Sequence, residues 1–125
     1  MRKLDGTYIY SPSDLITFLE SEYVSWMDRF DLDHPGVADR DETGDSDEIL
    51  RTKGQEHEQD FLAHLINSKR DVCEVKANSD RVATTLRAMK EGREVIYQAE
   101  LQHDNFRGFA DFLMRAEGPS ALGNY

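Results

Sequence analysis

The sequence REVIYQAELQHDNFRGFADFLM, residues 93–114, decides the fold, because it predicts two strands that fold back on each other around a polar turn at residues 102–105. Side chains alternate between the two faces of a strand with a period of two. In the second strand this alternation places Asp111 between Phe109 and Leu113, on a face that should be covered. A buried carboxylate must be hydrogen-bonded, paired or bound to a metal. Asp111 is therefore a candidate functional residue.

The composition indicates one soluble domain over residues 1–125, with 38% hydrophobic and 32% charged residues. No apolar run is long enough for a membrane span, and the first residues lack the apolar core of a signal peptide, so we expect a cytoplasmic protein without membrane contact. A single cysteine, Cys73, permits no internal disulfide and is expected to be a buried or half-buried apolar residue. The net charge of −10 disfavours non-specific attraction to a phosphate backbone.

The remaining pattern predicts three main helices packed on a small mixed or antiparallel sheet, an α+β fold. After a short strand at residues 7–10, Ser11 and Pro12 begin a core-facing helix that runs to Phe30. A second helix covers residues 48–68, and a short strand follows at 71–76. The third helix is capped by Ser79 and ended by Gly92.

Residues 31–47 form a predicted acidic surface loop, because the periodic pattern stops there and acidic residues, proline and glycine accumulate. Residues 39–47 imitate the alternating oxygen ligands of a calcium loop. The twelfth position, however, holds Leu50 in place of the glutamate that such loops use. A solvated acidic loop is the simpler interpretation, and residues 39–48 are then a candidate surface for a basic partner.

The second helix carries His57 on its predicted inward face, in a stripe with Phe61 and Leu65. Such a histidine is either a hydrogen-bonded core residue or a metal ligand. Gly54, one turn earlier, costs about 1 kcal/mol of helix propensity relative to alanine. This cost predicts that another backbone approaches the helix closely at Gly54.

Five sequence blocks, taken in order, resemble the start of a RecB-like predicted nuclease of the PD-(D/E)xK superfamily. They are YSPSDL with FLE (residues 10–15 and 18–20), GQEHE with Leu62 (54–58), AMKEG with VIYQA (88–92 and 95–99), GFADFL (108–113) and PSALG (119–123).

The resemblance implies a restriction-endonuclease-like core and the metal-dependent hydrolysis of DNA. Its glycine and histidine block falls on Gly54 and His57, and its glycine and aspartate block on Gly108 and Asp111. His57 and Asp111 would then be metal ligands and catalytic residues. The implied cofactor is Mg²⁺ or Mn²⁺, which lowers the pKa of bound water and neutralises charge on the scissile phosphate. The family also works with helicase-like partners.

Two departures from the family pattern limit the expected activity. The family places an E-x-K motif on the strand after the aspartate, and here the chain ends at Tyr125 before that strand, so the resemblance covers an N-terminal part of the domain. Glu74-Val75-Lys76 has the right letters but precedes Asp111, and we interpret it as a chance match. Ser21 stands where relatives can carry a cysteine of an iron–sulfur cluster.

We therefore expect weak metal binding and no appreciable cleavage of DNA. Residues 106–114 would be an exposed strand edge that favours self-association. The competing hypothesis is a small acidic interaction module without catalytic activity. A third is a decoy or regulator of a full-length nuclease.

Overall fold

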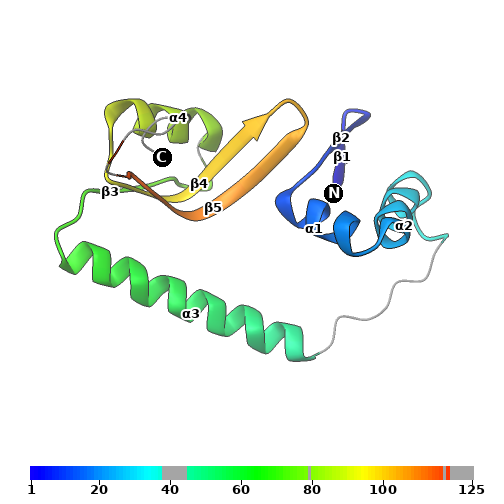
Figure 1. Cartoon of the computed structure of the whole chain (residues 1–125), viewed down its shortest axis with the longest axis horizontal. Helices are drawn as coiled ribbons and strands as arrows, with labels where there is room; N and C mark the ends of the chain where they lie inside the picture. The colour runs from blue at the N-terminus through cyan, green and yellow to red at the C-terminus, as the bar shows by residue number, and fades with distance from the viewer. Residues whose placement is uncertain (38–44, 79, 117, 119–125) are drawn as a thin grey trace. The chain divides into compact units, whose positions relative to one another are not determined.

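The computed structural model describes residues 1–37, 45–78, 80–116 and 118. These residues form a mixed α+β structure with four helices and two small sheets (Figure 1). The contacts divide the chain into two compact units. The first unit contains residues 1–37 and 102–108, and the second contains the described residues from 45 to 101 and from 109 onwards.

The first unit begins with a small hairpin. Strand β1 (Arg2–Leu4) pairs antiparallel with β2 (Thr7–Ile9). Asp5 and Gly6 form the turn, with φ of 47° and 80°. An Asp-Gly pair with two positive φ values is typical of the tightest hairpin turns. The pattern predicted β2, but not β1.

Two helices follow where the sequence predicted one. Helix α1 (Pro12–Glu20) ends at Ser21, and α2 (Glu22–Asp33) begins immediately after it. Ser21 is extended, with φ −158° and ψ 108°, and its hydroxyl accepts a hydrogen bond from Val24 N–H at 3.3 Å. A serine that caps the next helix therefore breaks the predicted one. The expected core-facing role is also wrong, because neither helix buries a residue.

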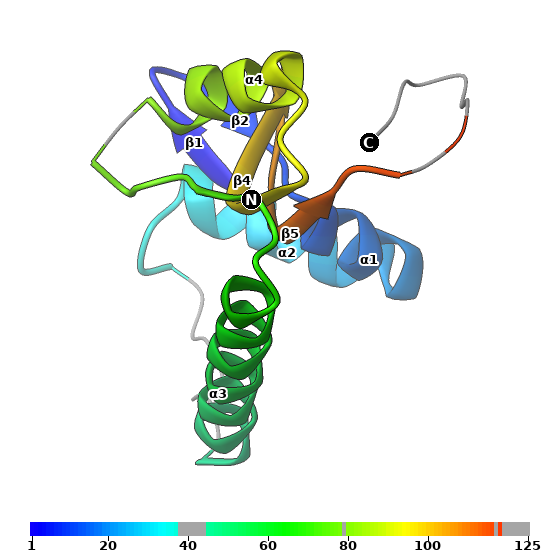
Figure 2. The ribbon, with the colours of Figure 1, turned by 90° about the vertical axis from the view of Figure 1, so that its left-hand side faces the viewer.

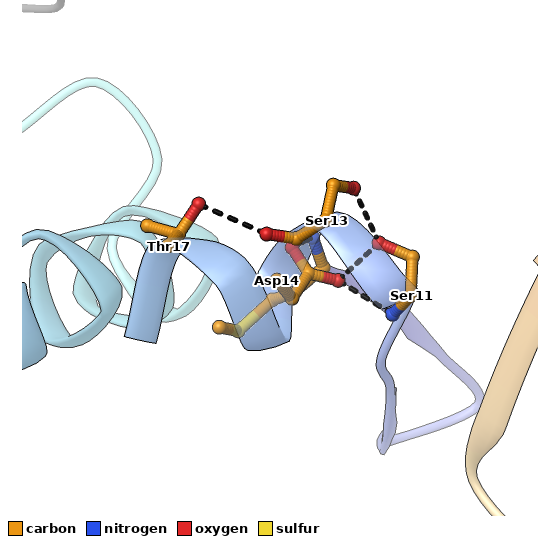
Figure 3. A network of polar contacts seen from close by, with 5 residues as sticks. Ser11, Ser13, Asp14 and Thr17 are labelled. Carbon is orange, nitrogen blue, oxygen red and sulfur yellow. Dashed lines mark hydrogen bonds and ion pairs between the residues drawn. The ribbon is translucent and has the colours of Figure 1, made fainter. Parts of the chain in front are cut away.

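The start of α1 is fixed by a short polar network, shown in Figure 3. The Asp14 carboxylate accepts hydrogen bonds from the backbone N–H and the hydroxyl of Ser11, both at 2.6 Å. The Thr17 hydroxyl donates to the carbonyl of Ser13 at 3.1 Å. Ser11 and Asp14 thus form the reciprocal cap that the sequence Ser-Pro-Ser-Asp favours.

The second unit contains a three-stranded sheet of order β3-β4-β5. Strand β3 (Val72–Glu74) is parallel to β4 (Val95–His103), and β5 (Phe106–Met114) follows β4 around a turn at residues 104–105. This confirms the predicted hairpin and the short strand before the third helix. In the described part of the chain β5 is an outer strand, so self-association along its edge stays a prediction that light scattering can test.

Helix α4 (Arg81–Glu91) connects β3 to β4 and ends at Gly92, whose φ is 73°. Its cap is Asp80, whose carboxylate accepts a hydrogen bond from Ala83 N–H at 3.1 Å. Ser79, the predicted cap, lies outside the described residues. The helix and its glycine stop are otherwise as predicted.

One cluster of the second unit's core lies between α4 and the sheet. Its fully buried apolar members are Val75, Ala88, Ile96 and Ala99, and Cys73, Met89, Ala110 and Leu113 pack against them. Cys73 is half-buried, as expected. Ile96 and Ala99 both join this cluster although they are three residues apart. Gln98 lies between them with φ 57°, so the strict alternation predicted for this strand is wrong.

Helix α3 (Asp45–Asn67) packs on the other face of the same sheet. The Gln59 side-chain amide donates to the Tyr97 hydroxyl at 3.1 Å. Since Tyr97 and Ile96 are neighbours in a strand, they point to opposite faces, and α3 and α4 therefore cover opposite faces of β4. Figure 2 shows α4 and α3 on either side of β4 and β5.

Candidate functional site

His57 lies on α3, one helical turn before Phe61. The Phe61 ring contacts Phe112 of β5 edge-on, with ring centroids 4.9 Å apart and an interplanar angle of 88°. The stripe of α3 that faces the sheet runs through Glu58, Leu62 and Leu65, and His57 lies at its edge. Its side chain is nevertheless exposed. The expectation of an inward, core histidine is therefore wrong.

Asp111 lies on β5, immediately before Phe112, and is also exposed. The sequence predicted that Asp111 and Leu113 share one covered face of β5. Instead, Ala110 and Leu113 both pack against the core, so the alternation along β5 is interrupted. Phe109, the predicted apolar neighbour, is 55% exposed. Asp111 is thus accessible to solvent and has no need of a buried partner.

The Phe61–Phe112 contact packs α3, the helix of His57, against β5, the strand of Asp111. His57 is one turn from Phe61, and Asp111 is adjacent to Phe112. Among residues 1–37, 45–78, 80–116 and 118, no cluster of three or more histidine, cysteine, aspartate or glutamate side chains forms a metal site. His57 and Asp111 are the two ligand candidates that the family pattern supplies.

A polar network joins α3, β4 and α4 next to His57. The Gln98 side-chain amide donates to Glu58, the residue after His57, at 2.5 Å. Arg81 of α4 donates to the backbone carbonyl of Gln98 at 2.9 Å and to its side-chain oxygen at 3.3 Å. Sequence analysis did not identify this network, because the alternation along the strand gives Gln98 no partner in the sequence. Its left-handed backbone has no signal in the local sequence.

Charge is also buried on the α4 side of the sheet. Glu100 is 1% exposed, and its carboxylate lies 3.9 Å from Nε of Arg81. The Arg81 guanidinium lies 4.7 Å from the centre of the Phe109 ring. Glu100 N–H donates to the hydroxyl of Thr85, which is fully buried, at 3.0 Å. These contacts hold α4 to the sheet.

The pKa of Tyr97, which faces α3, differs from the ordinary pKa of a tyrosine. Burial raises the pKa of Tyr97, and the neighbouring Glu58 carboxylate raises this pKa further. Tyr97 therefore stays neutral at physiological pH, and its hydroxyl accepts the hydrogen bond from Gln59.

The two glycines of the family blocks differ in their surroundings. Outside its own stretch of helix, no heavy atom of the described residues lies within 4 Å of the position where a Cβ would stand on Gly54. The predicted close approach of a backbone at Gly54 is therefore wrong. At Gly108, by contrast, a Cβ would stand 3.1 Å from Cγ of Pro12.

The E-x-K sequence of residues 74–76 belongs to the opposite edge of the sheet from Asp111. Glu74 ends β3, and β4 separates β3 from β5. Val75 is 2% exposed and is part of the core. This placement supports the interpretation of these residues as a chance match.

Most of the sequence that imitates a calcium loop, residues 39–47, lies outside the described residues, which omit residues 38–44. No helix in the described part of the chain is long and apolar enough to cross a membrane.

No protein-family model, curated protein or solved structure matches the chain.

Proposed function

We propose that this chain carries the His57 and Asp111 metal ligands of a RecB-like nuclease, on a restriction-endonuclease-like core. The ion is Mg²⁺ or Mn²⁺, and the substrate class is DNA. The observation that supports the proposal is the Phe61–Phe112 contact, because it packs α3, which carries His57, against β5, which carries Asp111. The ordered series of sequence blocks supplies the chemical interpretation.

The two ligand types suit this chemistry. A carboxylate oxygen is a preferred ligand of Mg²⁺, and imidazole is acceptable to Mn²⁺. Such an ion lowers the pKa of bound water and stabilises the charge that develops on a phosphate. With two protein ligands, water fills the remaining positions, so we expect weak binding that favours Mn²⁺ over Mg²⁺.

A titration with Mn²⁺ tests the site. Paramagnetic broadening in the NMR spectrum should be strongest around His57 and Asp111. His57→Ala and Asp111→Asn should each weaken binding about tenfold or more, since even changes in residues that only orient a ligand cost 10–100-fold. His64→Ala is the matched control, because His64 is an exposed histidine of the same helix, about 10 Å further along it. Equal effects of His57→Ala and His64→Ala would refute the site.

A cleavage assay tests the expected lack of turnover. The E-x-K sequence within the chain, residues 74–76, begins at the end of β3, across β4 from Asp111, and we interpret it as a chance match. We therefore expect no appreciable cutting of linear single- or double-stranded DNA in the presence of Mn²⁺. Metal-dependent cutting that His57→Ala abolishes would contradict the expected inactivity and would support the ligand assignment.

The alternative of an acidic interaction module assigned the partner surface to residues 39–48. Residues 39–44 of this segment lie outside the described residues.

A further inference from the structure

The part of α3 before Glu58 is exposed to solvent. Every residue from 49 to 57 is exposed, and Glu58 is the first residue after them that is half-buried. Leu62 and Leu65 follow on the same stripe of the helix, and Leu65 is 5% exposed. His57 therefore lies where α3 leaves the sheet, and the contacts of Glu58 decide where His57 is held.

Gln98 of β4 is the residue that holds Glu58. Its side-chain amide donates to the Glu58 carboxylate at 2.5 Å. Hydrogen bonds to an ionised group are shorter and stronger than those between neutral groups. The next residue of α3, Gln59, donates to the neighbouring Tyr97 of β4 at 3.1 Å. Two adjacent residues of the helix are thus bonded to two adjacent residues of the strand, which fixes the rotation of α3 about its axis.

The backbone of Gln98 is strained. Its φ of 57° lies in the left-handed region, which is unfavourable for a residue with a Cβ. Such strain persists where the surroundings hold it, and it is concentrated at functional sites. Arg81 of α4 holds Gln98, because its guanidinium donates to the backbone carbonyl at 2.9 Å and to the side-chain oxygen at 3.3 Å. A regular strand residue faces one side of a sheet, whereas Gln98 contacts the helices on both sides (Figure 2).

We propose that Gln98 is a positioning residue, which holds the turn of α3 that carries His57 at a fixed place against β4. Arg81 fixes Gln98 from the side of α4, and Gln98 fixes α3 through Glu58. An ion that binds to His57 then meets a ligand that is already in place, so less ordering is needed on binding. This consequence for metal binding rests on the proposed function, whereas the hold on α3 does not.

Gln98→Gly separates this hold from the overall stability of the fold. Glycine adopts a positive φ without strain, so the variant loses the strain together with the two side-chain hydrogen bonds. The midpoint of urea unfolding should therefore stay close to that of the unchanged chain. The amide protons of residues 55–59 should nevertheless exchange with solvent about tenfold faster, while those of residues 63–66 keep their rates.

Exchanging the two side chains tests the hydrogen bond itself. Gln98→Glu places two carboxylates against each other and should speed the exchange of residues 55–59. The double variant, Glu58→Gln with Gln98→Glu, restores a pair of amide and carboxylate in the reverse direction and should bring the rates back to within about threefold of the original. Glu56→Gln is the matched control for charge, because Glu56 is exposed on the same helix, and should change nothing.

An Mn²⁺ titration of the same variants measures the consequence for His57. Gln98→Gly should weaken Mn²⁺ binding about tenfold, as the loss of a group that orients a ligand does, and the double variant should recover it.

Three results would overturn the proposal. They are unchanged exchange of residues 55–59 in Gln98→Gly, a double variant no better than Gln98→Glu, and faster exchange in Gln98→Gly with unchanged Mn²⁺ affinity. If the original chain binds no Mn²⁺ while the exchange results are as expected, the proposed function fails and the hold of Gln98 on α3 is supported.

Discussion

Replacing Gly54 by alanine tests the surroundings of α3 directly. Gly54 lies inside this helix of 23 residues and is exposed to solvent. A Cβ at this position would meet no heavy atom within 4 Å in the described part of the chain, apart from its own stretch of helix. Gly54→Ala therefore adds a methyl group in open space and changes only the conformational preference of the chain.

The size of the effect follows from helix propensity. Alanine is about 0.8–1.0 kcal/mol more favourable than glycine in a helix interior. The free energy of unfolding should therefore rise by up to about 1 kcal/mol. For a cooperative unit of about 60–100 residues, this corresponds to a rise in Tm of roughly 4–8 °C. Ala63→Gly is the reciprocal control. Ala63 is exposed on the same helix, so its replacement should lower the free energy of unfolding by a similar amount.

The measurement is urea unfolding followed by far-UV circular dichroism. Glu58, Gln59 and Phe61 of α3 contact the sheet within two turns after Gly54. Because α3 should therefore unfold together with the sheet, a more stable helix should raise the free energy of unfolding that the assay measures. If Gly54→Ala destabilised the protein while Ala63→Gly behaved as expected, the open surroundings of Gly54 would be refuted. A close approach of another backbone would then explain the glycine.

Gly108→Ala should destabilise the first unit by about 1–3 kcal/mol in the same urea assay, because its Cβ would stand 3.1 Å from Pro12; a neutral result would show that Pro12 can move away. Thr85→Val should cost about 1–3 kcal/mol, since it leaves the buried N–H of Glu100 without its acceptor, and a loss no larger than that of an exposed threonine, such as Thr52→Val, would contradict this. Burial alone would raise the pKa of Asp14, but hydrogen bonds from the Met1 ammonium and from Ser11 outweigh it and lower the pKa below its ordinary 3.8. A lowered folded-state pKa adds stability above pH 3.8 that is lost as the pH falls through the folded value, so Asp14→Asn should flatten the decline of Tm in acid, and an unchanged slope would argue against the network.

The sequence predicted those helices and strands whose ends are determined by the residues at the ends themselves. Gly92 adopts a left-handed conformation and ends α4, as a glycine after a helical pattern indicates. The β4–β5 hairpin is recognisable from its alternation and polar turn. Ser21 was missed because the apolar spacing continues across it, and a serine inside a helix and a serine capping the next one look the same in a single sequence.

The faces of the strands could not be predicted, because they depend on contacts between distant parts of the chain. Gln98 takes a positive φ where it bonds to Glu58 of α3 and Arg81 of α4. That single residue moves Ala99 to the face already occupied by Ile96. A period-of-two pattern extended through Gln98 therefore assigns Ala99 to the wrong side of the sheet.

The exposure of His57 and Asp111 makes the metal hypothesis easier to test than burial would have. A buried ligand couples binding to folding, since its removal leaves a cavity or an unpaired group. Substitutions at exposed positions away from such features usually change stability by less than about 0.5 kcal/mol. His57→Ala and Asp111→Asn should therefore leave the urea transition in place, so a loss of Mn²⁺ binding in either variant reports on coordination alone.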